Sequence, residues 1–369
     1  MSSYVDHAAT SPIRPEALAA LHEGAQLVGN PAALHRAGQR ARARLEEARE
    51  ELAAAIDCRP PEVIFTSGGS EADSIAVLGG WRASARPRAL ISAIEHPAVK
   101  ESVRHGAELL PVTQEGTVDL GIAEELLDER VGLVSVQVVN NETGIIQPVP
   151  QLLDLSGRHG CWLHTDAVQA FGHLPLSFAQ LGVDLMSLSA HKIGGPIGVG
   201  ALIAKTGVEL TPVGLGGGQE RGVRSGTQSV ALAAGFAAAA TAMVEQRAAE
   251  RARLSQLNLR VRERLAGLGA RLTSEAQKTT PHIVHASFPG TRANDLLVLL
   301  DQRGVFASVG SACRAGVHQP SEVLLAMGAT AAEAASCLRF SFGWNTTEEE
   351  VERLCSQIGP ALELARSAF

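Results

Sequence analysis

The sequence lacks a long apolar run, and its N-terminus lacks the features of a secretory signal. The longest apolar stretch, 230–244, is rich in alanine and is interrupted by Gly235 and Thr241. It therefore falls short of the roughly 20 residues that a membrane span needs. The first 16 residues contain neither a basic region nor an apolar one, so no secretory signal is predicted. We expect a soluble, cytoplasmic protein with no membrane partner.

Paired cysteines and a block of basic residues are also missing. The five cysteines are scattered, odd in number and form no C-x-x-C motif, which argues against a disulfide framework and a structural zinc site. The 32 Lys and Arg residues are outnumbered by 39 Asp and Glu residues, giving a formal charge of −7. A mixed surface with a net negative charge argues against direct nucleic-acid binding.

What the sequence does contain is a repeated α/β pattern. Short apolar runs of strand length each end in a polar or glycine-rich cluster, and helix-like stretches such as 70–83 and 97–107 separate several of them. The runs are 63–65, 89–94, 133–139, 161–163 and 185–188. Alternating strands and helices predict a mostly parallel sheet, in which ligands bind beyond the carboxyl ends of the strands. We therefore expect the five polar clusters to meet at one site.

The rest of the chain predicts a second, smaller lobe. With 369 residues, of which 45% are hydrophobic, the chain is long enough for two lobes. A long helix is predicted over 35–56, and another over 237–265 leads into the second lobe. That lobe contains an apolar run near 282–288 and a helix near 294–302.

Lys192 and Asp166 are the strongest candidates for chemistry. Lys192 follows a strand expected to be buried, and a desolvated lysine has a lowered pKa and becomes a nucleophilic amine. Taken singly, a lysine at such a place is more commonly a surface residue at a strand–loop junction, and it is the neighbouring residues that favour chemistry here. A buried Asp166 needs a cationic partner, such as the protonated ring nitrogen of pyridoxal phosphate. The alternative, a metal bound by His164, Asp166 and His173, matches no standard ligand spacing, and no metal site is predicted.

Two glycine-rich segments, 68–71 and 216–220, are candidates for phosphate binding. The first opens a helix directly after a strand, where backbone N–H groups are free, although a simple helix cap would have the same sequence. The second is followed by 224–227, which adds a cation and a hydroxyl, but a flexible connector would look similar.

Cys313 and Arg339 complete the residues with chemical potential. Cys313 lies between glycines and near Arg314 and His318, a setting that favours the reactive thiolate. Arg339 could clamp a carboxylate with two hydrogen bonds or could form a structural salt bridge.

Together these segments resemble a known family, the pyridoxal-phosphate-dependent cysteine desulfurases of the class V aminotransferase group, and in particular their subgroup with a long cysteine loop. The resemblance runs from end to end and rests on motifs in the family's order. They are YVDHAAT, GNPAALHRAGQRAR, IFTSGGSEAD, EHPAV, VNNETGIIQP, HTDAVQA, SLSAHKIGGP, GGGQERGVRSGT, SVGSACRAG and RFSFGWNT. The resemblance implies the α/β fold-type I architecture of aminotransferases. It places a large cofactor-binding domain at 14–250 and a smaller α+β domain at 1–13 plus 251–369, which carries the cysteine loop.

The resemblance also implies roles for individual residues. Lys192 would bind pyridoxal 5'-phosphate through a Schiff base, Asp166 would pair with the ring nitrogen, and Gln169 would bond to the ring oxygen. His96 would stack on the ring and take part in proton transfer, while Asn141 and Arg339 would hold the substrate carboxylate. Phosphate binding would fall to Gly69, Ser70, Ser189 and His191, together with Thr227 from the partner subunit of a homodimer.

The implied activity is removal of sulfur from L-cysteine, which gives L-alanine and a persulfide on Cys313. An acceptor protein, a scaffold or a relay, would take the sulfur for iron–sulfur clusters, thio-cofactors or tRNA modification. The family usually has Ala-Thr at Gly69-Ser70 and serine at Val309, and scaffold-binding members have a longer tail than the one ending at Phe369, which puts scaffold docking in question.

Two other functions remain open from the sequence. One is a pyridoxal-phosphate lyase acting on selenocysteine or on another C–S bond, which would not need the thiol. The other is a cofactor-free interaction protein with the same fold.

Overall fold

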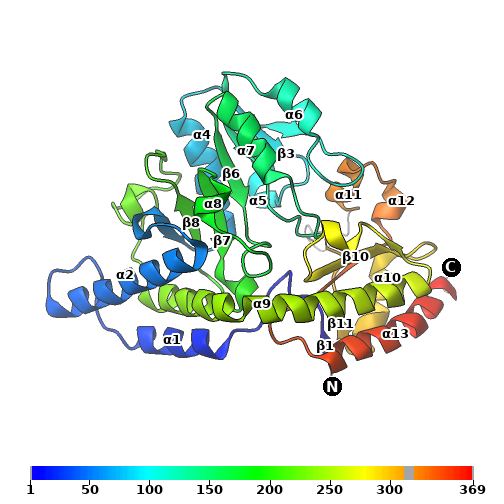
Figure 1. The fold of residues 1–369 in the computed structure, drawn as a ribbon. Coiled ribbons are helices and arrows are strands. Elements are labelled where there is room, and N and C mark those ends of the chain that lie inside the picture. The colour runs from blue at the N-terminus through cyan, green and yellow to red at the C-terminus, as the bar shows by residue number, and fades with distance from the viewer. Residues whose placement is uncertain (1, 311–319, 368–369) are drawn as a thin grey trace.

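The computed structural model describes residues 2–310 and 320–367 and has the expected α/β architecture (Figure 1). The helices are α1 (Pro15–Ala25), α2 (Arg36–Ile56), α3 (Gly69–Ser74), α4 (Gly80–Ala83), α5 (Pro97–Lys100), α6 (Leu120–Leu126), α7 (Val149–Arg158), α8 (Phe178–Leu181), α9 (Val230–Gly267), α10 (Ala293–Asp301), α11 (Glu322–Ala326), α12 (Ala331–Ala334) and α13 (Glu348–Ser367). The strands are β1 (Ser3–Tyr4), β2 (Val63–Thr66), β3 (Arg88–Ser92), β4 (Glu108–Leu110), β5 (Val131–Ser135), β6 (Trp162–Asp166), β7 (Leu185–Ser189), β8 (Gly200–Ala204), β9 (Arg271–Leu272), β10 (Ile283–Ser287), β11 (Val305–Phe306) and β12 (Cys337–Ser341).

The central sheet has seven strands in the order β2-β8-β7-β6-β5-β3-β4. All neighbouring pairs are parallel except those of β8, which runs antiparallel to both β2 and β7. The predicted mostly parallel sheet is therefore confirmed. The five predicted runs correspond to β2, β3, β5, β6 and β7, whose carboxyl ends all lie at one edge.

Both faces of this sheet are covered by helices, so β5 and β7 are buried at every residue. Buried side chains on one face form a cluster with α2, α7 and α9, and those on the other face form a cluster with the helical run 69–83. A helix-like stretch was predicted over 70–83, and the structure places a π-helical turn, Ile75–Gly79, between α3 and α4 there. Double coverage explains the long aliphatic runs of the strands.

The second lobe contains a small antiparallel sheet, β12-β10-β9, and the parallel pair β1 and β11. Its core includes Val5 and residues from Leu254 onward, packed against α10 and α13. Helix α9, 38 residues long, extends from beneath the large sheet to this lobe, where both termini lie (Figure 1). The domain limits of 14–250 and 1–13 plus 251–369 stay a prediction. No helix in the described ranges is long and apolar enough to span a membrane.

Candidate active site

A pocket of about 390 Å³ lies at the carboxyl edge of the sheet, between the two lobes. The loops that follow β2, β3, β5, β6 and β7 all contribute to its wall, as the five polar clusters predicted. The small lobe contributes Arg339 from β12, and the N-terminal segment contributes Ala8 and Ala9. The predicted site residues that line it are Gly69, Ser70, His96, Asn141, Asp166, Gln169, Ser189, His191, Lys192 and Arg339.

Two predicted site residues are not part of this wall. Thr227 is exposed and does not line the pocket of its own chain. Cys313 lies outside the described residues. Gly310 and Ser321, which lie before and after its segment, are both close to Glu142 of the pocket wall. A Cβ placed on Gly310 would lie 3.5 Å from the Glu142 Cβ, and Ser321 Oγ donates to Glu142 Oε2 at 2.5 Å.

Lys192 reaches the pocket from a short turn, Ala190–Ile193, that directly follows β7. Gly194 ends this turn with φ +81°, a conformation that favours glycine. The Lys192 Nζ donates to the carbonyl oxygens of Ala8 and Ala9 at 2.6 and 2.7 Å. Burial lowers the pKa of Lys192 to about 8, aided by the charge of Arg339 and opposed by nearby carboxylates. An appreciable fraction of this amine is therefore unprotonated near neutral pH, as nucleophilic attack requires.

Asp166 is the last residue of β6 and is buried at the base of the pocket. Its Oδ1 accepts a hydrogen bond from Val168 N at 2.8 Å. Burial raises the pKa of Asp166, while His96, that hydrogen bond and Lys192 lower it. A cation placed against this carboxylate would stabilise the charged form.

His96 lines the pocket from the start of α5. It is the N-cap residue of α5, and its Nδ1 accepts the N–H of Ala98 at 3.2 Å. Burial lowers the pKa of His96, the charge of Asp166 raises it, and that of Lys192 lowers it again. Because Nδ1 is occupied, Nε2 is the nitrogen that can exchange a proton in the pocket.

The pocket also contains two acidic residues that the sequence analysis missed, Asp73 and Glu95. Both are buried, and their Oδ1 and Oε2 atoms have no hydrogen-bond partner among the described residues. Burial raises the pKa of both carboxyls well above the usual values, and the charge of Asp166 raises them further. Burial and the neighbouring carboxylate thus disfavour the charged form of both carboxyls. Their only sequence signal was their position, with Asp73 three residues after Ser70 and Glu95 next to His96.

Gly69, Ser70, Ser189 and His191 also line the pocket, and they bring backbone N–H groups, two hydroxyls and an imidazole. Gly69 and Ser70 begin the helical run after β2, and the N-cap Gly68 supplies no side-chain hydrogen bond. His191 has its Nδ1 3.1 Å from Thr10 Oγ1, and burial lowers the pKa of this histidine to about 4. A Cβ on Gly69 would lie 2.9 Å from Val168 Cγ2, which is too close, so a larger residue at position 69 would require the valine side chain to move.

Arg339 lies in the middle of β12 and is held at the pocket by two partners. Its NH2 donates to Asp6 Oδ1 and its NH1 to the Asn141 carbonyl oxygen, both at 2.7 Å. The Nε of this buried side chain has no partner among the residues described. Arg339 thus forms a salt bridge, as one interpretation predicted, and it also lines the pocket, while its role in holding a carboxylate stays a prediction.

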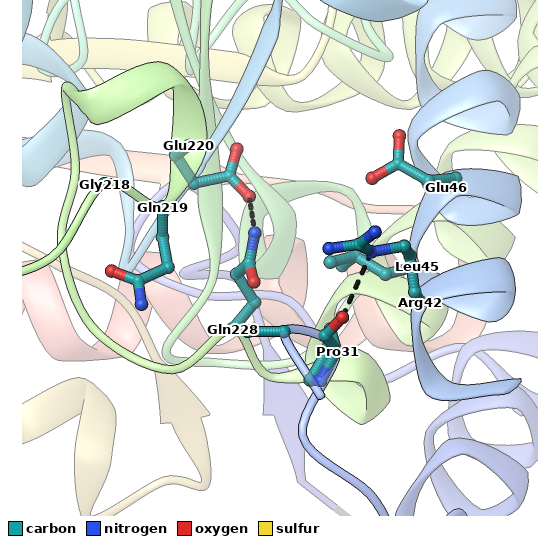
Figure 2. A pocket seen from close by; sticks show the side chains of 9 residues that line it. Pro31, Arg42, Leu45, Glu46, Gly218, Gln219, Glu220 and Gln228 are labelled. Carbon is teal, nitrogen blue, oxygen red and sulfur yellow. Dashed lines mark hydrogen bonds between the residues drawn. The ribbon is translucent and has the colours of Figure 1, made fainter. Parts of the chain in front are cut away.

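A second cavity of about 580 Å³ lies between α2 and the glycine-rich loop (Figure 2). Its charged side chains are already paired: Arg42 bonds to Pro31, and Glu220 accepts from Gln228 and from both terminal nitrogens of Arg49. The hydrogen bonds between Arg49 of α2 and Glu220 hold the loop that precedes Thr227 against α2. The cavity contains none of the predicted site residues.

The metal alternative finds no support in the positions of its histidines. The ring nitrogens of His164 face Ser135 and Ser187, and His173 stacks on His282. Within residues 2–310 and 320–367, no group of three or more His, Cys, Asp or Glu residues could hold a metal ion.

Comparison with known proteins identifies the family of the chain. The model of the aminotransferase class-V family matches residues 3–354. The chain is 41% identical to an IscS-like cysteine desulfurase of Mycobacterium tuberculosis over 99% of this chain and 98% of the relative. It is 36% identical to a putative cysteine desulfurase, IscS 1, of Bacillus subtilis over 98% of each.

Solved structures give the same answer for the fold. A NifS-like protein, 32% identical, superimposes with a TM-score of 0.91 over 99% of this chain and all of that chain. A NifS-like protein from Rickettsia africae, 27% identical, gives a TM-score of 0.90 over 98% of this chain and all of the other. The expected fold-type I architecture is confirmed. The chain belongs to the class-V aminotransferase family and, within it, to the pyridoxal-phosphate-dependent cysteine desulfurases.

Proposed function

We propose that this protein removes sulfur from L-cysteine in the cytoplasm, releasing L-alanine and leaving a persulfide on Cys313 for an acceptor protein. The observation that supports this most directly is one pocket lined by a lysine of lowered pKa, a buried aspartate and an arginine, with the flanks of the Cys313 segment at its wall. Relatives that are named cysteine desulfurase match nearly the whole chain, which supports L-cysteine as the substrate.

The residues of the pocket fit pyridoxal phosphate. The donors at Gly69, Ser70, Ser189 and His191 suit its phosphate, and the buried Asp166 suits a protonated ring nitrogen. The amine of Lys192 suits its aldehyde. When bound, the cofactor supplies an electron sink for the substrate α-carbon.

The chain's own side chains would perform the proton and sulfur transfers. Lys192 Nζ would take up the α-proton, and His96 Nε2 would exchange a proton at the same side of the pocket. Arg339 and Asn141 would hold the substrate carboxylate, with Arg339 sharing its donors with Asp6. The Cys313 thiolate would then bond to the substrate sulfur while the carbon–sulfur bond breaks, which leaves the extra sulfur on the protein.

We also propose that two copies form a homodimer in which Thr227 reaches the partner's phosphate site. Thr227 is exposed, and the preceding loop is fastened to the large lobe by the buried pair of Arg49 and Glu220. Three large apolar side chains are exposed in the segments that precede α2 and Glu220, with exposed fractions of 83% for Val28, 88% for Leu34 and 102% for Leu215. A surface shared with a second copy would remove them from water.

The test is incubation of the cofactor-loaded protein with L-cysteine in the absence of oxygen. We expect alanine to accumulate and the peptide containing Cys313 to gain the mass of one sulfur atom. Release of pyruvate or sulfide without alanine and without persulfide would favour the lyase. If no absorption band stays with the protein after unbound pyridoxal phosphate has been removed, the interaction protein would be favoured.

The pKa of Lys192 predicts how cofactor uptake depends on pH. The amine attacks the aldehyde only when unprotonated, and its pKa in the folded protein is about 8 rather than the usual 10.5. The rate at which pyridoxal phosphate adds to the cofactor-free protein should therefore rise with pH through a midpoint near 8 and then level off. Stopped-flow absorbance at a series of pH values would measure this, and a rate still rising at pH 10 would contradict it.

A further inference from the structure

Gln169 is held from two sides in the pocket wall. Its Nε2 donates to the Ala8 carbonyl oxygen at 2.9 Å, and its Oε1 lies 3.1 Å from Nε2 of His282. A backbone carbonyl can only accept, so the amide must present Nε2 to Ala8 and Oε1 to the histidine. The second N–H of Gln169 is then left for the pocket that this side chain lines.

The same contact determines where His282 carries its proton. Because the Gln169 Oε1 can only accept, Nε2 of His282 is the protonated nitrogen. Its Nδ1 lies 2.7 Å from Thr280 Oγ1 and accepts from that hydroxyl. Burial lowers the pKa of His282 well below its usual value, and neighbouring charges, first that of His173, lower it further. The ring is therefore neutral and has a single tautomer.

The His282 ring is itself held in place by a second buried histidine. His173 stacks on it with the ring centroids 3.6 Å apart and the planes inclined by 14°.

The Ala8 carbonyl that accepts from Gln169 also accepts from Lys192 Nζ at 2.6 Å. One hydrogen-bonded chain thus runs from Thr280 through His282 and Gln169 to the Ala8 carbonyl, where it meets the amine of Lys192.

We propose that His282 is a positioning residue that keeps the free N–H of Gln169 aimed at the ring oxygen of the bound cofactor. The inference rests on the proposed function, because that function supplies the acceptor. A hydrogen-bond donor at this ring oxygen stabilises the negative charge of the oxygen. The nitrogen that links the cofactor to the protein then loses its proton at a lower pH. Without His282, the Gln169 carbonyl is buried without a partner and the amide can turn away.

The readout is the pH midpoint of the visible absorption band of the bound cofactor, which does not depend on turnover. H282F keeps an aromatic ring for the stack on His173 but has no donor, and we expect it to raise the midpoint by about one pH unit. H282Q keeps an N–H near the position of Nε2, so its pH midpoint should equal that of the parent protein. In a double-mutant cycle, H282F should add no further shift to Q169L.

Asn258 offers a matched control, because its Nδ2 donates to the carbonyls of Pro281 and Ile283 without touching Gln169. N258A should loosen the same segment and leave the midpoint unchanged. An unchanged midpoint in H282F, or an equal shift in N258A, would overturn the inference. If H282F does not fold, ¹⁵N shifts of the wild-type imidazole decide, since an Nδ1–H tautomer of His282 would also overturn it. A parent protein that never forms the visible band would instead refute the proposed function.

Discussion

The Lys192→Ala variant is expected to lose the visible absorption of the bound cofactor and to release alanine from cysteine roughly 10²–10⁴-fold more slowly than the parent. The side chain has two proposed tasks, attachment of the cofactor and transfer of the α-proton. Its position fits both, because Nζ lies in the pocket within hydrogen-bond reach of the Ala8 and Ala9 carbonyls. Absorption spectra before and after borohydride treatment, together with alanine quantification, measure the two tasks separately.

Lys205 provides the matched control for this variant. It follows β8, is about half exposed and has its Nζ 3.8 Å from Asp184 Oδ1, away from the pocket. Lys205→Ala should therefore keep the absorption band, its sensitivity to borohydride and the rate of alanine release. If Lys192→Ala retained a borohydride-sensitive band, another amine would carry the cofactor and the proposed linkage would be wrong.

The site residues at the strand ends could be predicted because the residue that follows a parallel strand in the sequence also lies at the carboxyl edge of the sheet. Asp166 ends β6 and Lys192 comes three residues after β7, so a buried strand followed by a polar cluster was enough to bring them together. Strand β8 had no such signal. It runs antiparallel to its neighbours, so its carboxyl end at Ala204 lies at the opposite edge of the sheet. The apolar run at 133–139 also ends earlier than predicted, at Ser135.

The contacts between segments far apart in the sequence could not be predicted, because they depend on how those segments pack. Ala8 contributes only a backbone carbonyl, which no side-chain pattern reveals, yet it binds both Lys192 and Gln169. The pairing of Asp6 with Arg339 joins residues 333 positions apart. Thr227 has its proposed partner on another chain, so a single sequence carries no geometric trace of it. Resemblance to a family, not periodicity, supplied the role of Thr227, and that role stays a proposal.

Replacement of Cys313 by alanine should abolish both alanine release and persulfide formation while leaving the cofactor's absorption band intact. The reaction needs a thiolate that bonds to the substrate sulfur, and alanine has no atom that could replace it. Cys313 lies between Gly310, which lines the pocket, and Ser321, which bonds to Glu142 of the pocket wall. Mass spectrometry of the peptide and alanine quantification after incubation with cysteine measure the two losses.

The other four cysteines supply the controls, since burial raises the pKa of each thiol: to about 12 for Cys58 and Cys337, to about 11 for Cys161, and upward for Cys355. Such thiols are protonated near neutral pH and react slowly. Cys355→Ser, which changes a partly exposed thiol outside the pocket, should therefore retain full activity. Because a lyase that cleaves the carbon–sulfur bond directly needs no thiol, continued turnover by Cys313→Ala would favour that enzyme over the desulfurase.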